Sequence, residues 1–254
     1  MSWKKLLAAL AALSLPAALA SCGDGAKEAS GPLAPASYEQ RFGAQSEITP
    51  DNVAKLGLAW FHEFDTDRGQ QSIPVEVDGV LYTSTAWSKA YAFDAKTGKL
   101  LWSFDPEVPH ERMAGSCCDA VSRGVAVDKG KVFLAAYDGR IFALDAKTGK
   151  KLWEAQSIID MSKPYTVTGA PRVAGNRVII GNGGAELGVR GYITAFDTET
   201  GQKAWRFFTV PNPTGAPDGE ASDKISQELV NASWSDGAWK TTGGGGTVWD
   251  GMAY

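Results

Sequence analysis

Two adjacent cysteines, Cys117 and Cys118, are the most unusual chemical feature of the sequence, because the chain has only three cysteines. They lie in the segment GSCCDAVSRG, where Arg123 follows the second of them by five residues. Disulfides normally join Cα atoms about 4.4–6.8 Å apart, whereas neighbouring residues are about 3.8 Å apart, so bonding the pair closes a strained ring and stabilises little. The pair is therefore either two reduced, buried thiols or a feature that serves a ligand.

Four other segments carry polar or aromatic residues that the repeats described below do not explain. They are Glu76 in a predicted strand, Thr168 in TGAPRV, Gly184, Ala185 and Glu186 in the loop GNGGAELGVRG, and Thr247 and Trp249 in GGGGTVWD. Arginine forms paired charge-assisted hydrogen bonds with carboxylates, threonine bonds single oxygens, and glutamate is a hard ligand suited to Ca²⁺. Each also has a plain structural interpretation: Glu76 can face solvent, Arg123 can be a surface charge, and Trp249 can be a packing residue.

Several other kinds of chemistry are disfavoured by the sequence. The two histidines, His62 and His110, are not near a nucleophile motif, which argues against a serine or cysteine hydrolase. GNGG resembles a phosphate loop only weakly, because no helix with a dinucleotide fingerprint follows it. No C-x-x-C-H motif for haem attachment occurs in these residues. The formal charge of −4 argues against nucleic acid as a partner.

Residues 1–21 have the organisation of an export signal. MSWKK supplies positive charge, LLAALAALSLPAALA an apolar core and LASC a small-residue end. LASC also resembles a bacterial lipobox, with Cys22 as the lipid-bearing first residue; the alternative is cleavage after Ala20, which leaves Cys22 as a spare thiol. Removal of this segment takes away two lysines and no acids, so the formal charge becomes −6. The sequence therefore predicts a periplasmic protein in an oxidising compartment, with lipid anchoring through Cys22 as one alternative.

Three segments share the pattern A-x-D-x-x-T-G-x-x-x-W at spacings of 51 and 52 residues. They are AFDAKTGKLLW (92–102), ALDAKTGKKLW (143–153) and AFDTETGQKAW (195–205). A period of this length with one tryptophan in each unit is typical of a repeat architecture. The elements that must position the candidate residues are therefore the strands of this repeat.

Each repeat contains four short segments of alternating apolar residues, separated by turn signals. The predicted strands span 74–77, 80–85, 89–94 and 99–105 in the first unit, 124–128, 131–137, 140–145 and 150–156 in the second, and 170–174, 177–183, 191–197 and 202–208 in the third. No part of this core has the pattern of a long amphipathic helix. Four-stranded antiparallel units of this kind predict an all-β fold, a β-propeller.

The units at the two ends of this pattern are incomplete. Trp60, in LGLAWFHEF, predicts the last strand of a further blade, and GGTVWDGMAY follows a Pro- and Gly-rich excursion and begins a fourth blade. Three whole and two partial blades are fewer than a ring of about four to eight requires. We therefore expect an N-terminal fragment, with a linker over 22–47 and part of an eight-bladed propeller domain over 48–254.

The cysteine pair, the GGAE loop and GGGGTVWD, in this order among the repeats, resemble the pyrroloquinoline-quinone (PQQ) dependent alcohol dehydrogenases from about Ile48 to Tyr254. In that family the repeated tryptophans dock between blades, and the Asp and Thr-Gly hold the turn. The resemblance implies that Cys117 and Cys118 form a disulfide against one face of the planar PQQ, with Trp249 covering the other. It also implies PQQ-binding roles for Glu76, Arg123, Thr168 and Thr247 and for the backbone at Gly184 and Ala185.

The resemblance further implies that Glu186 binds Ca²⁺, or a lanthanide in its place, beside a quinone that takes a hydride from an alcohol. The remaining family ligands and the aspartate general base have no match before Tyr254, so we expect them further along the chain. Electrons then pass to a periplasmic cytochrome c or another acceptor, and the missing part can carry haem c. Isolated residues 22–254 are expected to bind PQQ weakly or not at all and not to oxidise alcohol.

The main alternative comes from a different class of protein. Propeller lipoproteins that assist outer-membrane protein assembly resemble this chain in lipobox and repeat type and are non-catalytic scaffolds. They lack the cysteine pair and the GGAE loop, which this sequence has. The two segments therefore favour the quinoprotein interpretation.

Overall fold

The computed structural model describes residues 47–115, 118–230, 233, 240 and 244–253, all of which belong to the compact unit Pro32–Tyr254. The predicted signal over 1–21, Cys22 and almost all of the linker over 22–47 lie outside the described residues. Within these described ranges, no helix has the length and apolar character needed to span a membrane.

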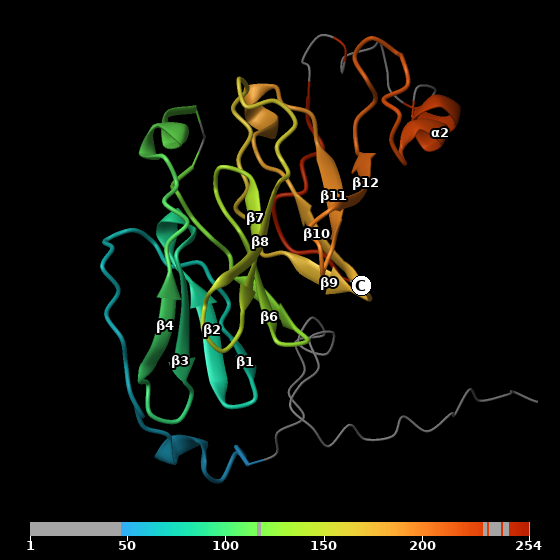
Figure 1. Cartoon of the computed structure of the whole chain (residues 1–254). Coiled ribbons are helices and arrows are strands. Elements are labelled where there is room, and N and C mark those ends of the chain that lie inside the picture. Colours follow the sequence, from blue (N-terminus) through green and yellow to red (C-terminus); the bar gives the residue numbers. More distant parts are fainter. Residues whose placement is uncertain (1–46, 116–117, 231–232, 234–239, 241–243, 254) are drawn as a thin grey trace, which may run out of the picture. The chain divides into compact units, whose positions relative to one another are not determined.

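In the described residues, twelve strands form three four-stranded antiparallel sheets, each in sequence order (Figure 1). The first sheet contains β1 (Val75–Val77), β2 (Val80–Ser84), β3 (Ala90–Asp94) and β4 (Leu100–Phe104); the second β5 (Val125–Asp128), β6 (Lys131–Ala135), β7 (Arg140–Asp145) and β8 (Lys151–Gln156); the third β9 (Arg172–Ala174), β10 (Arg177–Gly181), β11 (Tyr192–Asp197) and β12 (Lys203–Phe208). Each begins and ends within two residues of its predicted span. The all-β propeller prediction is confirmed.

The helices in the described ranges are short and lie in the connections. They are η1 (Val53–Lys55), η2 (Ala86–Ser88), η3 (His110–Gly115), η4 (Ala185–Leu187), α2 (Asp223–Ile225) and η5 (Ser226–Val230). η3 precedes the cysteine pair, and η4 contains the glutamate of the GGAE loop. The polar excursion after β12 contains α2 and η5. None of these elements has the length of an amphipathic core helix, as the sequence predicted.

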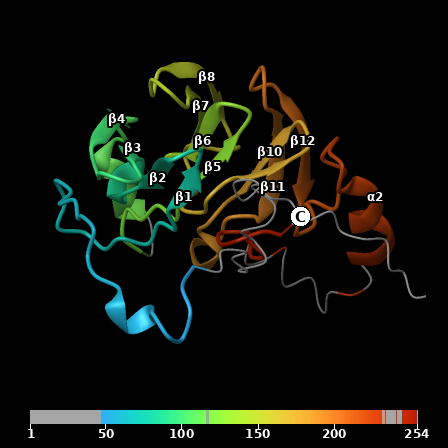
Figure 2. The ribbon, with the colours of Figure 1, turned by 90° about the horizontal axis from the view of Figure 1, so that it is seen from below.

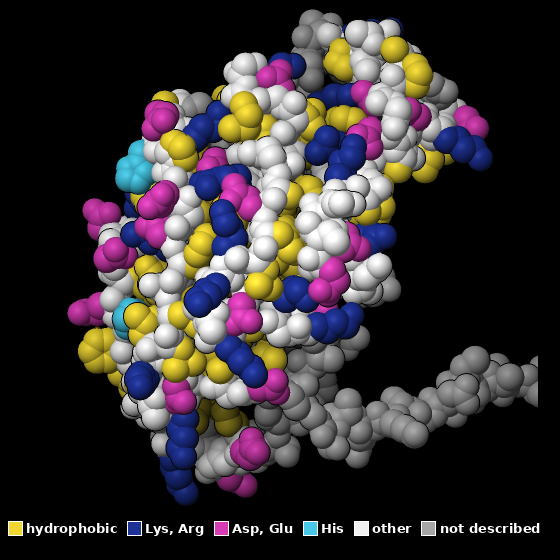
Figure 3. All heavy atoms as spheres, viewed as in Figure 1, with side chains coloured by type: hydrophobic (Ala, Val, Ile, Leu, Met, Phe, Trp, Pro, Cys, Tyr) yellow, Lys and Arg dark blue, Asp and Glu magenta, His cyan; other side chains and the backbone are white. Residues whose placement is uncertain are grey.

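The core lies between neighbouring sheets. One apolar cluster joins side chains of β1, β2 and β4 to those of β5, β6 and β7, and a second joins the second sheet to β10 and β11. The view from below shows β1 and β5 on the inner side and β4 and β8 on the outer side (Figure 2). The outer strands are correspondingly exposed, since Leu100 and Leu101 of β4 and Leu152 of β8 are all more than 40% accessible. On the face in Figure 3, basic and acidic side chains are interspersed.

Trp60, Trp102 and Trp153 each dock on the turn of the following blade. The indole N–H donates to a backbone carbonyl there: Trp60 to Ala95 (3.0 Å), Trp102 to Ala146 (2.9 Å) and Trp153 to Thr198 (3.0 Å). The six-membered part of each ring lies against the glycine of the same turn. A Cβ built on Gly149 lies only 2.7 Å from the Trp102 ring, and the corresponding distance for Gly201 and Trp153 is 2.6 Å. Glycine is therefore required for the rings to dock.

The Asp and Thr of the repeat stabilise the same turn. The carboxylate of Asp145 accepts hydrogen bonds from the backbone N–H and the hydroxyl of Thr148, both 2.8 Å long. Asp94 and Asp197 make the equivalent bonds in the other two blades. These bonds favour the ionised carboxylate and lower the pKa of all three aspartates.

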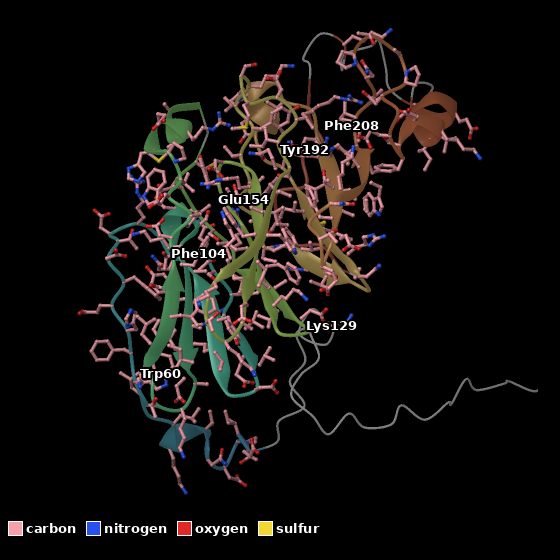
Figure 4. The ribbon with its side chains drawn as sticks, viewed as in Figure 1. Trp60, Phe104, Lys129, Glu154, Tyr192 and Phe208 are labelled. Atoms are coloured by element: carbon pink, nitrogen blue, oxygen red, sulfur yellow. The ribbon has the colours of Figure 1, made fainter. Side chains whose placement is uncertain are left out.

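The two predicted partial blades differ from the prediction. Trp60 docks as expected (Figure 4), but its segment is extended without forming a strand, because no described segment pairs with it. The segment 245–254 was predicted as the start of a fourth blade, but its described residues, 245–253, form no named strand. They lie instead against the third sheet, where glycines allow close backbone contact.

Gly149→Ala tests the docking contact. Gly130 is the matched control, since it has a similar φ of +75° against +69° but no atom within 4 Å of an added Cβ. Both substitutions place a side chain in the left-handed region, at a cost of about 1–2 kcal/mol. Gly149→Ala must also displace the Trp102 ring, which adds about 1–3 kcal/mol to the loss of unfolding free energy measured in urea. Equal losses for the two variants would show that the ring does not depend on this glycine.

The Asp145 turn predicts an acid-dependent contribution to stability. The folded pKa lies below the unfolded value of about 3.9, so the carboxylate stabilises the fold above that value, and this contribution is lost as the pH falls through the folded pKa. Asp145→Asn is expected to reduce the drop in urea midpoint between neutral pH and about pH 3. An acid profile identical to that of the unsubstituted chain would contradict this role.

Candidate functional site

A pocket of about 290 Å³ lies where connections from the second and third sheets meet the segment near residue 249. It brings together eight of the predicted site residues: Cys118, Arg123, Thr168, Gly184, Ala185, Glu186, Thr247 and Trp249. Asp119, Val121, Tyr137, Thr166 and Gly183 complete its lining. Because the lining residues come from five separate stretches of sequence, the pocket is a product of the fold.

Arg123 links two walls of the pocket. Its guanidinium group donates to the hydroxyl of Thr168 and lies 4.9 Å from the centre of the Trp249 ring. Its backbone N–H donates to the carbonyl of Thr168 (3.0 Å), and its carbonyl accepts from Ile73 (3.2 Å). Gly124 follows with φ +132°, which brings a built Cβ within 3.2 Å of the Ile73 carbonyl. The pocket thus has a fixed cation beside an aromatic face, an arrangement suited to a flat anionic ligand.

Glycine conformations place Glu186 at the rim of the pocket. Gly184 has φ +101°, and a Cβ there would meet the carbonyl of Pro164 at 2.6 Å, so a side chain is excluded. Gly183 donates to the carbonyl of Thr166 (2.8 Å), which fixes the start of the loop. η4 then carries Glu186, whose side chain is exposed at the pocket.

The third sheet supports this loop from below. Tyr192 packs edge-on against Phe208 at 5.8 Å between ring centres (Figure 4). Its hydroxyl donates to the carbonyl of Ser157 (2.9 Å), and burial raises its pKa well above the ordinary value. Its backbone N–H donates to the side-chain oxygen of the buried Asn182, which joins the strand to the loop (2.9 Å). The loop is therefore bonded to a well-packed part of the third sheet.

The segment 244–250 reaches the pocket by packing on glycines of the third blade. Gly245 donates to the carbonyl of Val189 (3.1 Å) and accepts from the N–H of Gly191 (2.8 Å). A Cβ on Gly181 would lie 2.2 Å from the Val248 carbonyl. This seating brings Trp249, which is 48% exposed, to the pocket wall.

The cysteine pair is described in part. Cys118 is exposed and lines the pocket. Cys117 lies outside the described residues, so the pairing of these two cysteines stays a prediction. The next residue, Asp119, forms an ion pair with Arg68 and accepts from the N–H of Ala120 (2.8 Å).

Glu76 does not line this pocket, so its predicted role in PQQ binding stays a prediction. It lies in β1 opposite Leu81, and its carboxylate accepts from the N–H of Gly79 (2.7 Å) in the hairpin turn. The residue of this segment that bonds to the pocket residue Arg123 is Ile73. Three residues of extended chain, about 10 Å, separate Ile73 from Glu76. Alternation along a strand predicts which face a side chain occupies, but not which end of the blade it approaches.

Three polar residues of the pocket were not predicted. Asp119 directly follows the cysteines, and Thr166 stands two residues before Thr168 in an extended segment, so this spacing could have identified it. Tyr137 is buried and looked like part of a core strand. In the described part of the chain, no three His, Cys, Asp or Glu side chains lie close enough together to hold a metal ion.

The fold and pocket define a class: a tryptophan-docking propeller with a site for a flat anionic ligand. The PQQ family described as "Glucose/ethanol/alcohol dehydrogenase, beta-propeller domain" matches residues 34–253, and the chain belongs to this family. It is 53% identical over 222 residues to the dehydrogenase subunit of the quinone alcohol dehydrogenase of Gluconobacter oxydans (strain 621H), covering 85% of this chain and 29% of that one. It is 49% identical over 205 residues to the "1-butanol dehydrogenase (cytochrome c)" of Thauera butanivorans, covering 81% and 29%.

Solved structures agree with this assignment. The quinohemoprotein alcohol dehydrogenase ADHIIG of Pseudomonas putida HK5 has a TM-score of 0.80 at 47% identity, covering 88% of this chain and 32% of that one. A "Europium-containing methanol dehydrogenase" has a TM-score of 0.69 at 34% identity, covering 83% and 37%. The chain thus spans about a third or less of the length of each of these proteins.

Gly181→Ala tests the seating of segment 244–250. The new Cβ must displace the Val248 carbonyl, whereas Gly69→Ala, the control, meets no atom within 4 Å. Neither glycine has a left-handed φ, so the comparison isolates the contact. Gly181→Ala is expected to speed amide hydrogen exchange at Gly191 and Gly245 by about tenfold or more, because a loss of about 1.4 kcal/mol of local stability corresponds to tenfold. Unchanged exchange at both amides would mean that the segment is not seated there.

Proposed function

We propose that the protein carrying this chain oxidises alcohols with PQQ, and that this chain forms part of the PQQ site. The observation that carries the proposal is the pocket, because it joins Arg123, Thr168, Thr247 and Trp249 from separate segments. The family and the quinone-dependent relatives support the same cofactor. When bound, PQQ supplies the two-electron acceptor for the oxidation.

The residues present fit PQQ in size, charge and shape. The pocket volume is close to the lower end of the range for small-molecule sites, about 300–1,000 Å³. Arg123 offers a cation to a carboxylate of the ligand, and the hydroxyls of Thr168 and Thr247 offer bonds to single oxygens. Trp249 presents an aromatic wall, and Cys117 and Cys118 are proposed to form a disulfide platform opposite it.

We further propose that Glu186 contributes to a site for Ca²⁺ or a lanthanide. Its carboxylate is exposed to the pocket and so has the chemistry that hard cations require. The europium named for the methanol dehydrogenase supports the lanthanide alternative. Further ligands and the general base are proposed to come from residues other than those described.

The proposed substrate is a primary or secondary alcohol, and the proposed electron acceptor is a periplasmic cytochrome c or a similar carrier. The cytochrome named for the Thauera butanivorans relative supports this acceptor. Export by residues 1–21 and a lipid on Cys22 are proposals from the sequence. Residues 22–254 alone are proposed not to turn over alcohol.

Arg123→Gln tests the proposed function in protein expressed from the complete gene. Loss of a charge-assisted hydrogen bond costs about 1.5–3 kcal/mol, so the PQQ concentration for half-maximal alcohol-dependent dye reduction is expected to rise at least about tenfold. Arg177→Gln is the control, because Arg177 pairs with Asp197 in the third blade and not in the pocket. Alcohol-dependent dye reduction without PQQ, or an unchanged PQQ requirement in Arg123→Gln, would contradict the proposal, whereas no dye reduction with PQQ present would favour a scaffold.

A further inference from the structure

The pocket wall beside Cys118 contains a carboxylate, which would oppose an anionic cofactor. Asp119 lines the pocket with its side chain 37% exposed. A tricarboxylated quinone close to it would meet like-charge repulsion, which is strong wherever water is partly excluded. Some feature of the chain must compensate for this charge if the pocket is to hold such a ligand.

Arg68 provides that compensation from another part of the sequence. Its guanidinium group makes an ion pair with Asp119, although 51 residues separate the two. The same carboxylate oxygen also accepts from the N–H of Ala120 at 2.8 Å. Arg68 does not line this pocket, so it acts on the pocket through Asp119.

Trp87 contacts Arg68 and also the residue that follows Asp119. Its ring lies 5.1 Å from the guanidinium carbon of Arg68 and stacks on His110 at 4.0 Å between ring centres. Its backbone N–H donates to the carbonyl of Ala120 at 2.9 Å. To do this, Trp87 adopts φ +61°, a left-handed conformation that is costly for a bulky residue and is kept only where the surroundings impose it. The cluster therefore fixes Arg68 against the wall that carries Asp119.

We propose that Arg68, held by Trp87, is a positioning residue that neutralises Asp119 so that this wall accepts an anionic planar cofactor. The inference rests on the proposed function, since PQQ is the ligand considered. It assigns the wall beside Cys118 no net charge, so that the other charged groups among the described lining residues are Arg123 and Glu186.

The test measures PQQ binding by quenching of tryptophan fluorescence, without turnover, in apo-protein expressed from the complete gene. Arg68→Gln leaves Asp119 uncompensated and is expected to weaken binding about tenfold, and more at low ionic strength, where screening is weaker. Asp119→Asn leaves Arg68 as a net cation and is expected to tighten binding a few-fold. Arg68→Gln with Asp119→Asn is expected to return to within about threefold of the unsubstituted protein, because the wall is neutral again.

The controls separate charge from packing. Arg68→Lys keeps the charge and is expected to bind PQQ nearly normally. Arg177→Gln removes a different arginine–aspartate pair of comparable exposure (33% and 28%, against 31% and 37%) and should not change binding. Thermal unfolding checks that each variant is folded. A double variant that binds as weakly as Arg68→Gln, or normal PQQ binding by Arg68→Gln or by Asp119→Asn alone, overturns the inference. Absence of PQQ binding in the unsubstituted protein overturns the proposed function instead.

Discussion

The docking of a tryptophan ring on a left-handed glycine of the next blade is the contact on which the rest of this structure depends. It occurs in the pairs Trp60–Gly98, Trp102–Gly149 and Trp153–Gly201. Each indole ring donates a hydrogen bond to the neighbouring turn and also packs against it. The two contacts together fix the spacing and the orientation of neighbouring blades. Because the outer strands are held in this way, the inner strands β1, β5 and β9 can lie close together and the connections at one end of the sheets can converge.

The pocket is a consequence of that convergence. Its walls are connections rather than strands, which is why the repeat consensus contains none of its charged residues. Two glycines then allow close backbone contacts in these connections. Gly184 lies against the backbone of Pro164, and Gly181 lies against the backbone of Val248. The sheets thus position irregular connections that contain the pocket residues. Sites on loops that are held by a rigid scaffold are common in proteins.

The sequence predicted the strands well because alternation and the Asp-x-x-Thr-Gly turn are local signals, and each strand begins and ends within two residues of its prediction. It predicted most pocket residues because they depart from the repeat. It did not indicate that Glu76 lies away from the pocket, since periodicity does not say how far along a blade a residue lies. It also could not reveal the pairing of Arg68 with Asp119, because 51 residues separate them and only the packing of η2 beside the pocket wall brings them together.

The central claim is that this chain forms one side of a quinone site between Trp249 and Cys118. An experimental structure of the protein expressed from its complete gene, with PQQ bound, tests it most directly. The account predicts the planar quinone between the Trp249 ring and Cys118, with a carboxylate on the guanidinium group of Arg123. A quinone bound away from these three residues would contradict it.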